Sequence, residues 1–260
     1  MAGQNKNGVV VQSVDRACEI LECFTGLREE LGIKEISEMM NLSKSTVYGL
    51  VNTLVQNNFL EQNIDNKRYK LGIKLFELGM LTHRRMNLEN EVKERAEFLS
   101  KKYSSTVHLA AIYHDMNIVY IYKKDSPDSV IIYSQLGKKA PSNSSGVGKA
   151  IAAFLDEKLQ NEILEINDFE KLTKNTLTSN TDIKKEWNKV KKLGYAVDNE
   201  EVEMGLRCVA APIFGVDKKP IAAISVSASI SQITEDIIED IAKDIKQIAD
   251  EISFRQGIKF

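Results

Sequence analysis

The segment from Met39 to Leu60 contains no aspartate or glutamate, although 37 of the 260 residues of the chain are acidic. Apolar residues recur at helical spacing from Val47 to Leu54, and Ser43 can cap the helix that this spacing predicts. The opposite face carries side chains that can reach base edges or phosphates, without carboxylates to repel a phosphate backbone. We therefore identify this face as a candidate DNA-reading surface. Its candidate contacts are Ser43, Lys44, Ser45, Thr46, Tyr48 and Asn52.

The elements around this helix complete a motif. A short helix is predicted over 33–40, and only the turn 41–43 separates it from the acid-free helix, which is a helix-turn-helix pattern. A short strand at 59–61, a turn-rich stretch and a return strand at 68–71 follow, as in a winged helix. The wing offers Lys67, Arg68 and Lys70 for phosphate contacts. Helix-turn-helix motifs also serve as protein-docking surfaces, so docking stays the alternative.

A second kind of chemistry lies in the C-terminal half. Ser225 and Ser227 are two apart in a predicted strand, so both hydroxyls face one side, where they suit a carboxylate or a sugar hydroxyl. A pair of small residues accommodating a helix explains them equally well. SSGVGKA at 144–150 opens a helix whose N–H groups could meet an anion. It departs from a nucleotide P-loop at Asn143 and Ala150, and tight packing against the sheet is the simpler explanation of its glycines.

Other reactive residues show no catalytic pattern. Cys208 begins an apolar strand, where a buried thiol is the default. Asp198 lies in an acidic stretch that a solvated loop would explain, or it accepts a hydrogen bond from a ligand hydroxyl. The three histidines and three cysteines show neither nucleophile–base nor metal-ligand spacing. The pattern therefore predicts no enzyme, no metal and no cofactor.

Composition and element order set the architecture that must position these residues. The formal net charge is −2, and no apolar run approaches the ~18 residues of a membrane span. Sparse cysteines without a signal peptide favour the cytoplasm. A first helix is expected after Ser13, with Val14, Ala17, Cys18 and Leu21 inward. Helices and strands, including one at 130–133, mix without βαβ alternation, so the fold class is α+β with an antiparallel sheet.

Longer segments resemble the IclR family of bacterial regulators. The N-terminal match is SKSTVYGLVNTLVQNNFLEQ (43–62) with RYKLGIKLFELG (68–79). The C-terminal match is SSGVGKAIAAFL (144–155), LGYAVDNEEVEMGLRCVAAPIF (193–214) and IAAISVSAS (221–229). The resemblance implies a winged-helix DNA-binding domain at 1–72, a linker helix at 73–86 and a GAF-like effector domain at 87–260. One departure is Gly49, where many members carry a basic residue, so no particular operator is implied.

The resemblance also implies a function and its site. It implies a homodimer, or two such dimers paired into a tetramer, that binds double-stranded operator DNA; we expect a repressor. A small acidic effector, such as a sugar acid or 2-keto acid, would bind in the C-terminal domain. The alternative is a helix-turn-helix docking module with a ligand-sensing domain. Family correspondence places six residues around the ligand: Gly146, Val147, Asp198, Cys208, Ser225 and Ser227.

Overall fold

The computed structural model describes residues 9–25, 28–84, 88–113, 117–126, 136–166 and 169–256. The strand expected at 130–133 lies outside them. The chain divides into two compact units, Met1–Met86 and Asn87–Phe260. Within the described residues, no helix is long and apolar enough to cross a membrane.

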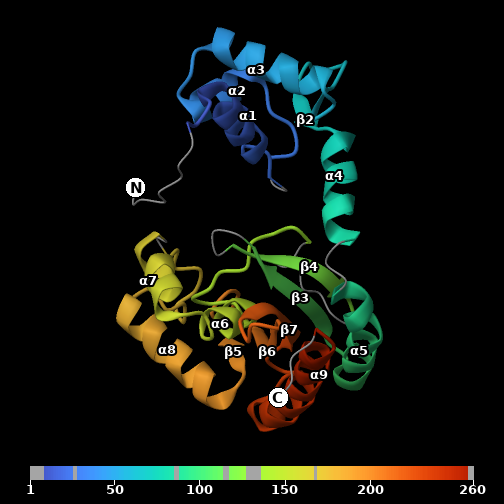
Figure 1. Cartoon of the computed structure of the whole chain (residues 1–260), viewed down its shortest axis with the longest axis vertical. Helices are drawn as coiled ribbons and strands as arrows, with labels where there is room; N and C mark the ends of the chain where they lie inside the picture. Colours follow the sequence, from blue (N-terminus) through green and yellow to red (C-terminus); the bar gives the residue numbers. More distant parts are fainter. Residues whose placement is uncertain are drawn as a thin grey trace. The chain divides into compact units, whose positions relative to one another are not determined.

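The N-terminal unit is a three-helix domain followed by a hairpin and a fourth helix (Figure 1). Its elements are α1 (Gln12–Glu22), α2 (Ile33–Met40), α3 (Lys44–Gln56), β1 (Leu60–Gln62), β2 (Tyr69–Leu71) and α4 (Ile73–Arg84). Ile20, Ile36, Val47 and Val51 are fully buried in one core that holds the helices together. This arrangement is the predicted helix-turn-helix with a hairpin wing.

The inward face predicted for the first helix is half right, because Ala17 and Leu21 pack against the core whereas Val14 and Cys18 are exposed. The helix begins at Gln12 without a side-chain cap. Its fully buried residue is Ile20, and Phe24, just after the helix, is buried beside it. Burying these larger side chains removes more apolar surface from water, so the side that holds them faces the core.

A close approach of backbone fixes the exit from the wing. A Cβ added at Gly72 would lie 2.2 Å from the carbonyl oxygen of Asn58, so no side chain fits there. Gly72 N–H donates to the carbonyl of Phe59 at 2.8 Å, which joins the end of β2 to the segment before β1. The glycine therefore holds the start of α4 against the hairpin.

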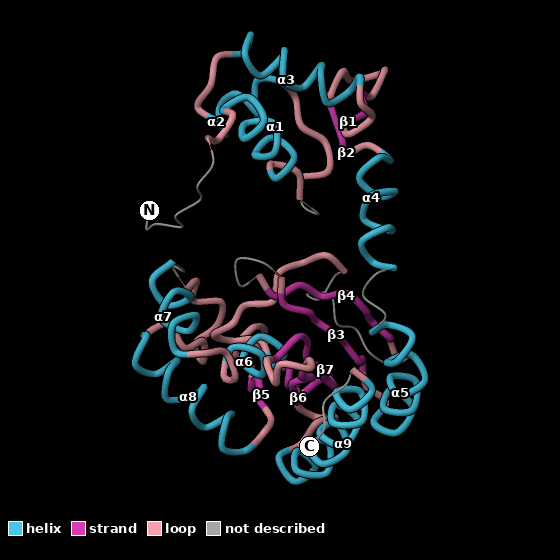
Figure 2. The backbone as a smooth tube through the Cα atoms, viewed as in Figure 1, coloured by secondary structure: helices cyan, strands magenta, loops and turns pink. Residues whose placement is uncertain are grey.

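The C-terminal unit is a five-stranded antiparallel sheet in the order β4-β3-β7-β6-β5, with helices on both faces (Figure 2). One core joins the sheet to α5 and α9, and a second core joins its other face to α6, α7 and α8. The predicted α+β class with an antiparallel sheet is confirmed. The elements are α5 (Leu88–Tyr103), β3 (Thr106–Ile112), β4 (Ile118–Lys124), α6 (Gly146–Ala152), α7 (Glu157–Ile166), α8 (Asn180–Leu193), β5 (Ala196–Asn199), β6 (Leu206–Phe214), β7 (Pro220–Ser229) and α9 (Ile238–Arg255), the last preceded by a 3-10 turn (Glu235–Ile237).

Strand register brings the polar residues of the C-terminal unit together. Ser227 pairs with Cys208, and Cys208 pairs with Asp198 on the next strand. On the other side of β7, Ser225 pairs with His108. Alternation places Ala222, Ile224 and Val226 in the core under α9, so the serine face is the one toward α6.

Candidate functional site

The polar face of α3 is exposed within its unit. Ser43 caps the helix, because its Oγ accepts a hydrogen bond from the Thr46 N–H at 3.2 Å and lies 2.9 Å from the hydroxyls of Ser45 and Thr46. Tyr48 is 58% exposed, and Lys44 and the other candidate contacts on this helix are exposed too. The helix N-terminus, with three hydroxyls and a lysine, is suited to a phosphate group.

Gly49 leaves the centre of this face open. A Cβ added there would meet no heavy atom within 4 Å, so packing inside the unit does not require a glycine. Gly in a helix interior costs about 1 kcal/mol relative to Ala. The cost is offset if another molecule approaches the backbone at this point.

The three cations of the wing have different surroundings. The Arg68 guanidinium lies 2.8 Å from a carboxylate oxygen of Glu35 and donates to the carbonyl of Glu30 at 2.9 Å, so it braces the wing against α2. Lys70 lies 3.4 Å from Glu61 across the hairpin. Lys67 is exposed at the tip, in a left-handed conformation with φ of 58°. Lys67 is therefore the wing residue best placed for a phosphate, whereas Arg68 positions the wing.

The six residues expected around the ligand line one pocket between the sheet and the start of α6. The pocket leaves about 20 Å³ for a water-sized sphere, which is room for one water molecule. A metabolite therefore requires the pocket to expand. Sequence reasoning missed five further lining residues: His108, Tyr120, Ser145, Val202 and Leu206.

Asp198 is the one carboxylate among the described lining residues, and no lysine or arginine is among them. Burial raises the pKa of Asp198 to about 7, although the charge of Lys149 and hydrogen bonds from the N–H groups of Glu201 and Val202 act in the opposite direction. Its carboxyl group therefore holds the segment after β5 and is easily protonated.

Behind Asp198 lies a buried charge cluster that sequence reasoning also missed. Lys149, fully buried on α6, forms an ion pair with Glu201, lies 3.6 Å from Glu186 and donates to the carbonyl of Val197 at 2.6 Å. The second oxygen of Glu201 is buried without a hydrogen-bond partner in the described structure. Lys149 is thus the counter-charge that allows carboxylates to remain beside the pocket. The GKA sequence gave no signal of this role, because a lysine on a helix is usually solvated.

The glycines of SSGVGKA have a packing explanation. A Cβ at Gly148 would lie 2.0 Å from the carbonyl oxygen of Pro141, and one at Gly146 would lie 3.3 Å from Cβ of Cys208. Ser145 caps α6 through the N–H of Gly148 at 3.1 Å. Burial raises the pKa of Cys208 well above its usual range, so its thiol stays protonated.

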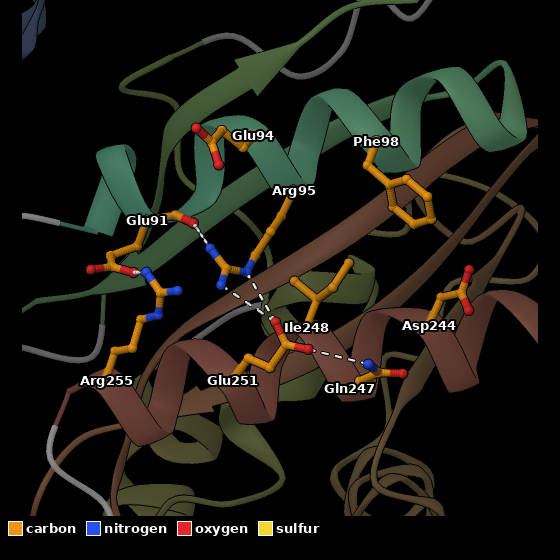
Figure 3. Close-up of a pocket in the computed structure, with 9 residues that line it drawn as sticks. All are labelled: Glu91, Glu94, Arg95, Phe98, Asp244, Gln247, Ile248, Glu251 and Arg255. Atoms are coloured by element: carbon orange, nitrogen blue, oxygen red, sulfur yellow. Dashed lines mark hydrogen bonds and ion pairs between the residues drawn. The ribbon is translucent and has the colours of Figure 1, made fainter.

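An open groove separates α5 from α9 on the other side of the sheet (Figure 3). Ion pairs cross it from Arg95 to Glu251 at 3.3 Å and from Arg255 to Glu91 at 3.0 Å. Because its arginines are matched by carboxylates of the facing helix, these pairs tie the two helices together. In the part of the chain described here, no group of three or more histidine, cysteine, aspartate or glutamate side chains could hold a metal ion.

A winged helix with an exposed acid-free face, carried on the same chain as an α+β domain with a small polar pocket, is the architecture of a DNA-binding regulator. The IclR helix-turn-helix domain matches residues 13–63, and the C-terminal domain of bacterial transcriptional regulators of the IclR type matches residues 80–254. The chain belongs to the IclR family and is a DNA-binding transcription regulator, not an enzyme.

Individual relatives match along nearly the whole chain. The HTH-type transcriptional regulator XynR of Escherichia coli is 35% identical over 87% of this chain and 89% of its own length. KdgR of the same organism is 33% identical over 95% of this chain and 93% of its own length. The IclR crystal structure from Thermotoga maritima superposes with a TM-score of 0.70 at 35% identity, covering 95% of this chain and 99% of that one.

Proposed function

We propose that this regulator is a homodimeric repressor whose hold on operator DNA is set by a small carboxylate, such as a sugar acid or a 2-keto acid, in the α6 pocket. The observation that carries this proposal is the pocket itself. Asp198, Ser225 and Ser227, together with Cys208, converge on one enclosed space although they come from three strands. Hydroxyl groups there can donate to a carboxylate, and Asp198 can accept from a ligand hydroxyl.

The DNA contacts we propose are those chosen from the sequence, apart from Arg68, whose guanidinium lies against Glu35. The α3 contacts Ser43 to Thr46, Tyr48 and Asn52 would reach the major groove, with Lys67 and Lys70 on the flanking phosphates. We also propose the division into a DNA-binding domain at 1–72, a linker helix at 73–86 and an effector domain at 87–260.

Dimerisation is supported by apolar side chains that the N-terminal unit leaves in solvent. Phe76 on α4 is 64% exposed, and Ile73 and Leu81 on the same helix are also more than half exposed. A monomer gains nothing from such exposure, whereas a second copy would bury these side chains. A dimer reads two half-sites, so a ligand that alters the spacing of the winged helices alters the affinity for the operator.

Repression is supported by the names of relatives. The transcriptional repressor IclR of Escherichia coli is 29% identical over 95% of this chain, and the acetate operon repressor of Salmonella typhimurium is 28% identical over 95%. A reporter driven by the protein's own upstream promoter would therefore rise when the regulator is deleted. A fall would show activation.

Fluorescence anisotropy with the protein's own upstream DNA tests both DNA binding and its regulation by a ligand. We expect affinity to fall steeply with salt, as phosphate contacts require. Binding that is absent even at low salt would support the docking alternative.

The ligand response is tested by adding a panel of sugar acids, 2-keto acids and 4-hydroxybenzoate, the ligand of an IclR homolog from Microbacterium hydrocarbonoxydans. The double variant Ser225→Ala with Ser227→Ala should bind DNA normally and lose the ligand response; an intact response would refute the pocket.

A further inference from the structure

His108 on β3 is a pocket residue for which neither the sequence motifs nor the proposed function supplied a role. It is 3% exposed and lines the pocket beside Tyr120, with the two ring centroids 5.4 Å apart. Its Nδ1 lies 3.3 Å from Oγ of Ser227, one of the two serines proposed to meet the effector.

The imidazole is held in its neutral form. Burial, helped by the positive charge of Lys123, lowers the pKa of His108 to about 3. A neutral imidazole has one nitrogen that donates and one that accepts, and its hydrogen bonds decide which is which. The hydrogen bond to Ser227 can therefore run in either direction.

We propose that His108 is a positioning residue of the effector pocket, whose tautomer decides whether the Ser227 hydroxyl donates to the ligand or accepts from it. With the proton on Nδ1, the ring donates to Oγ of Ser227, so the hydroxyl hydrogen turns away from the ring, toward Sγ of Cys208 or toward the ligand. With the proton on Nε2, Ser227 must donate to Nδ1 and offers the ligand only lone pairs. The inference deepens the proposed function and rests on one part of it, that an effector binds in this pocket.

The consequence is a rule for ligand class. A carboxylate only accepts hydrogen bonds, so it requires the Nδ1–H form, whereas a ligand hydroxyl can donate to the other form. Because no lysine or arginine is among the described lining residues, hydroxyl donors carry much of the recognition of an anion here. An acidic effector should therefore select the Nδ1–H tautomer of His108.

The first experiment reads the tautomer directly. The full-length protein is labelled with ¹⁵N-histidine, and the signals of His108 among the three histidines are identified by their loss in the variant His108→Phe. The probes are gluconate and sorbitol, which share a carbon skeleton but end in a carboxylate and a hydroxymethyl group. We expect gluconate to bind with the His108 proton on Nδ1. Gluconate bound with the proton on Nε2 would overturn the inference.

The second experiment measures the coupling between the two residues. His108→Phe should weaken gluconate binding by up to about tenfold, because Ser227 keeps its hydroxyl group but loses the neutral hydrogen bond that orients it. It should add no further loss once Ser227→Ala is present. The matched control is Ser225→Ala, on the same strand and without a hydrogen bond to His108, where the two losses should multiply. His108→Asn, which keeps an N–H near the position of Nδ1, should recover most of the affinity.

The outcomes separate the inference from the function beneath it. Suppose that gluconate binds, but His108→Phe lowers its affinity by the same factor in the Ser227→Ala and Ser225→Ala backgrounds. The inference then fails, and the carboxylate effector stands. If sorbitol binds with the proton on Nε2 and gluconate does not bind, the tautomer rule holds and the acidic effector is refuted. If neither these probes nor 4-hydroxybenzoate binds, the proposed carboxylate control fails and the inference falls with it. Trp187 fluorescence confirms that each variant is folded, because this single tryptophan is buried in the same unit.

Discussion

Replacing Lys149 with Met tests whether this buried cation is the counter-charge that holds the pocket wall. The substitution keeps an unbranched chain of similar size and removes the ammonium group. Glu201 then keeps a buried carboxylate without its ion-pair partner, and the carbonyl of Val197 loses the hydrogen bond it receives at 2.6 Å. Glu186, 3.6 Å from the same nitrogen, loses a weaker contact.

The magnitude follows from the burial of the group. Lys149 is 0% exposed, and removing one partner of a buried ion pair costs about 3–5 kcal/mol, because the other charge is left without compensation. For a unit the size of Asn87–Phe260, each kcal/mol lowers Tm by about 2–4 °C. We expect Lys149→Met to lower Tm of the C-terminal unit by roughly 10 °C at pH 7.5.

Trp187 provides the assay, since the only tryptophan of the chain lies in the core next to α6 and donates to the carbonyl of Ser142 at 3.1 Å. Its fluorescence follows the unfolding of the C-terminal unit without a contribution from the other unit. Lys158→Met is the matched control, because Lys158 is exposed and its ion pair with Glu162 on the same helix is long, at 3.8 Å. That control should leave Tm unchanged.

Two further measurements separate lost charge compensation from lost packing. Burial raises the pKa of Glu201, and without Lys149 it rises further, so the carboxylate is protonated more readily. The destabilisation should therefore shrink at pH 5, and adding Glu201→Gln to Lys149→Met should restore part of Tm. If Lys149→Met unfolds at the wild-type temperature, or if neither low pH nor Glu201→Gln helps, the counter-charge reasoning is refuted.

Three other predictions concern the DNA surface and the pocket. Gly49→Glu should abolish operator binding without lowering the stability of the N-terminal unit, because a side chain meets nothing there; anisotropy and thermal unfolding check the two halves of this statement. Lys67→Ala should reduce the salt slope of DNA binding by about 1. Arg68→Ala should instead lower the stability of the N-terminal unit, because it breaks the contact with Glu35. If the two variants have the same salt slope and the same stability, the two residues do not have different roles. Burial raises the pKa of Asp198 from 3.8 in the unfolded chain to about 7 in the folded state, so between these values the native state holds a proton that the unfolded state has lost. This group therefore makes the free energy of unfolding fall as pH rises from about 4 to 7. Asp198→Asn should flatten that part of the stability profile measured by Trp187 fluorescence, and an unchanged slope would refute the assignment.

Most elements followed from local patterns, whereas α7 and β5 were not predicted. Ser43 caps the helix predicted after it, and the apolar spacing from Val47 to Leu54 marks the side that the core buries. Alternation on β7 gave the shared face of Ser225 and Ser227. Such features depend on neighbours within a few residues, so they are readable without the fold.

The first helix shows where local patterns are insufficient. Val14 and Ile20 belong to competing apolar stripes, and only packing against α2 and α3 selected the stripe that holds Ile20. In the wing, charge alone predicted that Arg68 contacts a phosphate, and only the fold shows that Glu35 lies beside its guanidinium. We therefore propose that this cation positions the wing.

The family, the fold class, the acid-free helix α3 and the paired serines of β7 could be predicted without coordinates, because composition, periodicity and contiguous motifs carry them. The fold was needed to show that His108 faces Ser227, 119 residues away, and that Lys149 meets Glu201, 52 residues away. The physical reason is that a histidine or a lysine in a strand or helix has the same local pattern whether its partner is water or a distant side chain. Burial against that partner changes its chemistry, and sheet register and helix packing set which partner it meets.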